Sequence, residues 1–152
     1  MLRFLTGYPT AGAHTPRQQL ALRVAAGGAM LYYHGWHKAV EGAAYALRGE
    51  SWPLLVEVAQ LGLPLPLASA VFATIAQGLG SAFVIVGLFT RAAALFVAAT
   101  LTVAVYANLA HGEDPQLALL YLVGFALVAW QGPGSNSVDE ILTLENPKDV
   151  LK

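Results

Sequence analysis

The few residues of this chain that can bind or react gather near the ends of its apolar segments. His34, His37 and Lys38 close the first apolar segment, and Asn108 and His111 close a later one. Imidazole and ammonium groups donate hydrogen bonds, and histidine exchanges protons near neutral pH. Counting helical rise from the segment ends places all five side chains in one layer. We expect them to form a polar cluster at the outer mouth of a helical bundle.

Two further polar residues lie deeper in the apolar segments. Gln77 is about ten residues into the second long apolar segment, which places it near Gly27 and Thr100. Arg23 shares a helical stripe with His34, but about 16 Å of helix rise separates the two residues. We therefore expect Arg23 in the other half of the bundle, near Gln77. The full set of ligand-binding candidates is His34, His37, Lys38, Asn108, His111, Gln77 and Arg23.

Each candidate also has a purely structural interpretation. Arg23 can extend to phospholipid phosphates or bond a backbone carbonyl, and Gln77 can join two helices by hydrogen bonds. The outer histidines and Lys38 can contact lipid headgroups. The sequence leaves these alternatives open, and it assigns no catalytic residue.

Metal, haem and thiol chemistry find little support. Three histidines, His34, His37 and His111, offer imidazole ligands, and histidines on opposing helices can bind haem. Their spacing matches no known metal signature, so we expect no metal site. With no cysteine, the chain cannot form disulfides or hold an Fe–S cluster or covalent haem. It has no nucleophile elbow, phosphate-binding glycine loop or paired carboxylates, so whether it is an enzyme stays open.

The composition predicts a membrane domain. The chain is 57% hydrophobic and only 11% charged, whereas soluble domains are about 25% charged. Long stretches contain no charged residue, and a membrane-crossing helix needs about 20 mostly apolar residues. We predict an all-α integral membrane four-helix bundle, a single domain over residues 1–152. Its transmembrane helices are expected at about 18–37, 67–89, 92–110 and 115–131.

The connections and the charge pattern complete this expectation. Apolar residues at helical spacing predict a short amphipathic interfacial helix at about 51–61, with Trp52 as an interface anchor. Residues 132–152 read as a polar C-terminal tail. Six of the eight basic residues lie on one side if the N-terminus is cytoplasmic, which predicts both termini inside. The net charge of −1 gives no basis for a nucleic-acid partner.

Several ordered motifs resemble the DoxX family of small bacterial four-helix membrane proteins. They span about residues 20–140, nearly the whole chain. The chain departs from the family pattern at position 77, where it has Gln77 and the family often carries a glutamate. The motifs are Arg23-x3-Gly27 leading to His34-Gly35-x-x-Lys38, Gly62-Leu63-Pro64, Gly87-Leu88-Phe89-Thr90-Arg91, His111, and Gly132-Pro133-Gly134 followed by Ser137-Val138-Asp139.

This resemblance implies a multi-pass protein of the bacterial inner (cytoplasmic) membrane that is linked to respiratory oxidoreductases. Related DoxD proteins are subunits of a thiosulfate:quinone oxidoreductase. The implied partners are the lipid bilayer and other membrane or redox subunits, and the implied bound molecule is a quinone rather than a cofactor built into the chain. The sequence leaves open whether the chain also associates with itself.

Two functional hypotheses follow. In the first, the chain is a quinone- or lipid-binding subunit whose His34, Lys38 and His111 hydrogen-bond the headgroup. In the second, it is a non-catalytic structural accessory subunit that packs against a larger membrane complex. Transport of a small solute is less favoured, because no helices carry the paired Gly/Pro interruptions of transporter sites.

Overall fold

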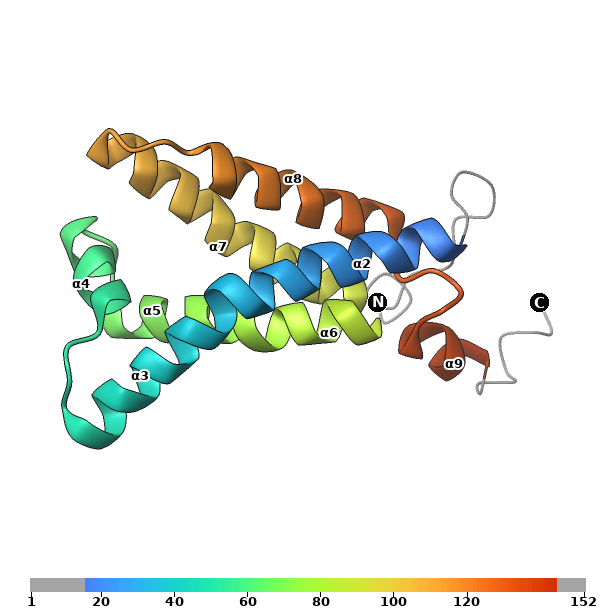
Figure 1. The fold of residues 1–152 in the computed structure, drawn as a ribbon, viewed down its shortest axis with the longest axis horizontal. Helices are drawn as coiled ribbons and strands as arrows, with labels where there is room; N and C mark the ends of the chain where they lie inside the picture. The colour runs from blue at the N-terminus through green and yellow to red at the C-terminus, as the bar shows by residue number, and fades with distance from the viewer. Residues whose placement is uncertain (1–15, 145–152) are drawn as a thin grey trace.

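The described part of the chain consists of helices and their connections and contains no strand, which confirms the predicted all-α class for these residues. A computed structural model describes residues 16–144, in which long helices run side by side and a short helix lies near each end of the molecule (Figure 1). Two of the elements, η1 and η2, are short π-helical segments. In chain order the elements are α2 (Pro16–Met30), η1 (Leu31–Gly35), α3 (Trp36–Arg48), α4 (Pro53–Gln60), α5 (Pro66–Ile75), η2 (Ala76–Gly80), α6 (Ser81–Val86), α7 (Thr90–His111), α8 (Gln116–Gln131) and α9 (Val138–Leu144).

The first helix is longer than predicted. α2, η1 and α3 follow one another without a break, because the residues at both junctions keep right-handed helical backbone angles. The helix ends at Arg48, where Gly49 adopts the left-handed conformation (φ 69°) that closes helices. The predicted end at His37 is therefore wrong. The continuous apolar run stops near His37, but residues 39–48 include four alanines, and alanine is the strongest helix former.

We call the continuous helix α2–η1–α3 the first rod. The second rod combines α5, η2 and α6. It starts with Pro66 in its first turn and ends where Gly87 takes a positive φ of 76°. Within the described residues, two helices are long and apolar enough to cross a membrane, Pro66–Val86 and Thr90–His111. α8 is also apolar but has only 16 residues. The first helix, with its charged residues, is not among those that meet this test.

The helices enclose two separate cores. α2 packs against α6 and α8, and α7 runs along α8, while α3 and α7 diverge toward α4 (Figure 1). Small residues on α7 let these helices approach closely. The larger core holds Met30, Val84, Ala93, Ala94, Val97, Ala98, Leu101, Phe125 and Val128, and the smaller one, beneath α4, holds Trp52, Leu54, Val58 and Ala70.

Trp52 holds α4 in place rather than anchoring it at an interface. Its side chain is only 4% exposed, and its ring lies 5.9 Å from that of Tyr45 on α3. A Cβ at Gly42 would come within 3.1 Å of the indole, so the glycine leaves space for the ring. The predicted role of Trp52 as an interface anchor is wrong, because the extended α3 supplies a surface that buries it.

The two rods touch most closely where both are π-helical. A Cβ at Gly35 would lie 2.7 Å from the carbonyl oxygen of Gln77 and 2.9 Å from Cα of Gly78. Only a residue without a side chain fits here. π-Helical segments widen a helical turn and often occur at functional sites. The crossing of η1 and η2 therefore marks the region in which to look for a site.

We expect Gly35→Ala to destabilise the protein by about 1–3 kcal/mol, because the added methyl group must push the two backbones apart. Thermal unfolding of the purified protein in detergent measures this. Gly28→Ala is the matched control, since a Cβ at Gly28 meets nothing within 4 Å in the described structure. An equal melting temperature for the two variants would contradict the close crossing.

Candidate functional site

A chain of hydrogen bonds joins three helices beside the crossing. Lys38 Nζ donates to Gln77 Oε1 at 2.8 Å, and Gln77 Nε2 donates to Thr100 Oγ1 at 3.2 Å. The Thr100 hydroxyl in turn donates to the backbone carbonyl of Val97 at 2.8 Å. Gln77 is only 3% exposed, so its amide needs these partners. The expected proximity of Gln77 and Thr100 is present, and Lys38 joins them.

The direction of these bonds explains the use of an amide at position 77. The ammonium group of Lys38 can only donate, and the Thr100 hydroxyl already donates to a carbonyl. Gln77 must therefore accept on one side and donate on the other, which an amide does and a carboxylate does not. One ammonium N–H of Lys38 is used in this way, which leaves two for a bound molecule.

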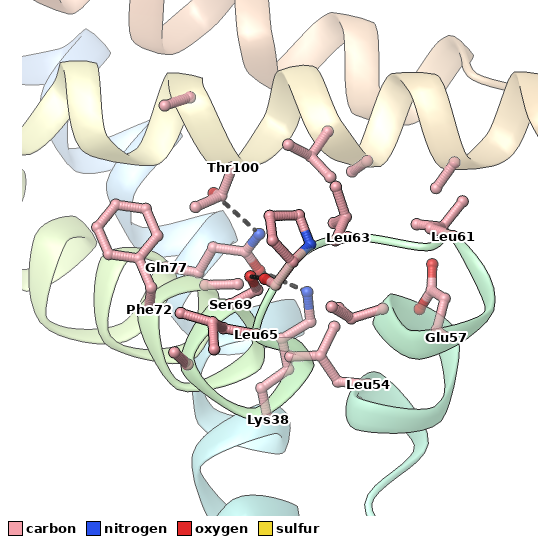
Figure 2. Close-up of a pocket in the computed structure, with 18 residues that line it drawn as sticks. Lys38, Leu54, Glu57, Leu61, Leu63, Leu65, Ser69, Phe72, Gln77 and Thr100 are labelled. Carbon is pink, nitrogen blue, oxygen red and sulfur yellow. Dashed lines mark hydrogen bonds between the residues drawn. The ribbon is translucent and has the colours of Figure 1, made fainter.

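A cavity of about 490 Å³ opens on one side of this chain. Figure 2 shows Lys38 directed toward Gln77 at its centre, with Phe72 and Glu57 on opposite sides of the view. α3, α4, α5, η2 and α7 all contribute to the lining, which is otherwise mostly apolar. The volume lies within the range of about 300–1,000 Å³ typical of small-molecule sites.

A smaller cavity of about 160 Å³ lies on the other side of Lys38 and Gln77. His34, Asn108 and Tyr121 line it, and the His34 ring stands edge-on to Tyr121 with 5.3 Å between the ring centroids. Because Lys38 and Gln77 line both cavities, their hydrogen bond lies between a mostly apolar space and a more polar one.

The structure divides the cluster predicted at the outer mouth. His34, Lys38 and Asn108 line the small cavity, whereas His37 and His111 are exposed and line neither cavity. Gly35, and not Gly27, lies against Gln77. The depth estimate was wrong here because it assumed regular helices with aligned ends.

Glu57 is a cavity residue that the sequence did not single out. It stands on α4 at the edge of the large cavity, and its carboxylate attracts the ammonium group of Lys38. Its place on the polar face of a short amphipathic helix was the available signal. Within residues 16–144, no three His, Cys, Asp or Glu side chains lie close enough to hold a metal ion.

Arg23 belongs to a different site at the opposite end of the molecule. It is 1% exposed, and its Nη2 donates to the backbone carbonyl of Asn136. The predicted proximity of Arg23 to Gln77 is wrong, because Gln77 bonds Lys38 and Thr100. A Cβ at Gly87 would collide with Arg23, so the guanidinium fills the space beneath this turn.

Asp139 joins the C-terminal segment to the start of α7 at this end of the molecule, and the sequence did not identify it as a site residue. Its carboxylate accepts hydrogen bonds from the backbone N–H groups of Phe89 and Thr90, at 2.7 and 2.9 Å, and from the Thr90 hydroxyl at 2.8 Å. An acidic group at a helix N-terminus stabilises the exposed N–H groups and the helix dipole. Asp139 also attracts Arg23 electrostatically, so this part of the predicted polar C-terminal tail packs against α7 and α2.

A comparison with protein families gives a match over more than half of the chain. The model of the DoxX family matches residues 18–112, which include η1, η2, Lys38, Gln77 and Thr100. The chain belongs to the DoxX family. Together with its apolar helices, this membership indicates a membrane protein. No match was found among curated proteins or among solved structures.

We expect Asp139→Asn to lower the free energy of unfolding by about 3 kcal/mol or more, because it removes the buried charge that caps α7 and attracts Arg23. Limited proteolysis of the segment from Gly132 to Leu144, together with thermal unfolding, measures the effect. Glu113→Gln is the control, since Glu113 is exposed and only its backbone N–H is hydrogen-bonded in the described structure. Equal protease resistance in the two variants would contradict the capping role.

Proposed function

We propose that this DoxX-family protein binds a quinone in the cavity beside Lys38 and serves as a membrane subunit of a respiratory or redox system. The ligand's polar ring lies against Lys38 and Gln77, and its apolar part contacts the remaining lining. The same proposal places the chain in a bacterial inner membrane with four membrane-crossing helices and both termini inside.

The mostly apolar cavity of about 490 Å³, with Lys38 and Gln77 at its centre and Glu57 at its edge, is the observation that carries this proposal. A quinone has carbonyl acceptors on an apolar ring, and the Lys38 ammonium group, which gives one N–H to Gln77, has two other N–H donors of which one can bond one of these carbonyls. Hydrogen bonds from a charged donor are stronger than neutral ones, and more so where water is excluded. This arrangement favours an uncharged acceptor on a hydrophobic molecule.

The identity of residue 77 supports the same ligand class. A glutamate beside Lys38 would neutralise its charge and compete with the ligand for its N–H groups. Gln77 orients the ammonium group through a 2.8 Å hydrogen bond and carries no charge of its own. Lys38 thus keeps its positive charge available for a carbonyl, or for the negative charge that develops when a quinone is reduced.

We expect Lys38→Met to weaken quinone binding by about 10- to 100-fold, since a hydrogen bond to a charged group contributes about 1.5–3 kcal/mol. Gln77→Leu weakens binding as well, because Lys38 loses the group that orients it. Binding of a ubiquinone with a single isoprene unit, measured by equilibrium titration of the purified protein, tests both. Quinone extracted after purification in mild detergent gives a second readout.

His37→Gln and His111→Gln serve as controls and should bind the quinone as the unmodified protein does, because both residues are exposed outside the two cavities. Absence of binding by the unmodified protein would overturn the proposal. If a larger membrane protein co-purifies in that case, the result favours a structural accessory subunit instead.

The proposed orientation has its own test, which uses the absence of cysteine from the chain. Glu113→Cys introduces a single thiol in the α7–α8 connection, and Ser135→Cys introduces one beside α9, both at exposed positions. With both termini inside, a membrane-impermeant maleimide should label the first variant in intact spheroplasts and the second only after permeabilisation. The reverse pattern would show the opposite orientation.

A further inference from the structure

A second cavity lies beside the first along the same pair of helices. It is an open groove of about 370 Å³ between the α5–η2–α6 rod and α7, and lining side chains such as Leu79 and Phe96 are more than half exposed. Its lining consists only of apolar side chains and one glycine, Gly80, in contrast to the polar centre of the first cavity. A space of this kind can hold hydrocarbon but offers no hydrogen bond to a polar group.

The two cavities are adjacent, because Phe72 lines both of them. The Phe72 ring meets that of Phe96 edge-on, with 6.0 Å between the centroids, and Phe96 lines the second cavity. On α7, Thr100 lines the first cavity and Phe96, one turn earlier, lines the second. The apolar space therefore begins within one helical turn of the Lys38–Gln77–Thr100 chain.

We propose that the bound molecule carries one long prenyl chain, which passes Phe72 and Phe96 and occupies the second cavity. This inference rests on the proposed function and specifies the ligand as a long-chain quinone. The first cavity binds the ring, and the second selects for the chain. The contact between the two aromatic rings is the point where the chain crosses from one cavity to the other.

A phospholipid fits this arrangement less well. Its phosphate would lie in a mostly apolar cavity whose other charged group, Glu57, is an anion that repels it. Burying an incompletely paired charge is costly. A phospholipid also carries two chains, whereas one apolar cavity adjoins the polar centre. An uncharged ring with a single chain matches both features.

The test compares ubiquinones of one and eight isoprene units, titrated as mole fractions in lipid nanodiscs. Ala92→Trp fills the second cavity with an indole, since Ala92 lines that cavity and not the first. We expect it to weaken binding of the long-chain quinone by about tenfold through the lost packing contacts. Binding of the short-chain quinone should stay unchanged, which also shows that the variant is folded.

Ala126→Trp is the matched control, because Ala126 is exposed on α8 and lines neither cavity. If Ala92→Trp fails to fold, Leu79→Trp places an indole in the same cavity from the α5–η2–α6 rod. If the protein binds both quinones with the same affinity, or if neither tryptophan variant weakens binding of the long-chain quinone, the chain site is overturned. The proposed function stands in that case, because the ring still binds. The chain site is also overturned if the tryptophan variants lose a co-purified phospholipid but bind the long-chain quinone as the unmodified protein does. Absence of binding by quinones of both lengths overturns the proposed function itself.

Discussion

The close contact of two helical rods at Gly35 is the constraint on which the rest of the structure depends. The backbone of Gln77 and Gly78 occupies the place that a side chain at position 35 would need. This contact brings Lys38 within hydrogen-bonding distance of Gln77, one helical turn from the crossing. Since both rods are π-helical here, each presents a widened turn at the level where polar side chains meet.

The polar layer at the crossing separates the two apolar cores. On one side, α2, α6, α7 and α8 pack with small residues between them, and on the other, Trp52 fixes α4 against α3. Because α3 and α7 diverge beyond the crossing, α4 spans a space that side chains do not fill. The large cavity is thus a consequence of the crossing geometry and not of any one lining residue.

Much of the helix layout could be predicted from the sequence, because charge-free runs of about 20 residues have few alternatives. The types of the central residues, Lys38 and Gln77, were also recognisable as polar groups in apolar segments. The contact between Lys38 and Gln77 could not be predicted. The depth of each residue in the bundle depends on where its rod starts and on the π-helical segments, and these segments leave no clear pattern in the sequence. Asp139 and Thr90 are 49 residues apart, and no local spacing connects them.

The position of Asp139 has a consequence for how the chain is made. Arg23 emerges from the ribosome 113 residues before its carbonyl partner Asn136, and the nearby Asp139 follows Asn136. Until Asn136 has been synthesised, the Arg23 guanidinium group lacks this carbonyl partner and depends on other acceptors such as water or lipid phosphates. The N-terminus of α7 likewise lacks its capping carboxylate until Asp139 has been synthesised. These contacts can therefore form only after Asn136 and Asp139 have been synthesised, and both residues lie beyond the matched family region.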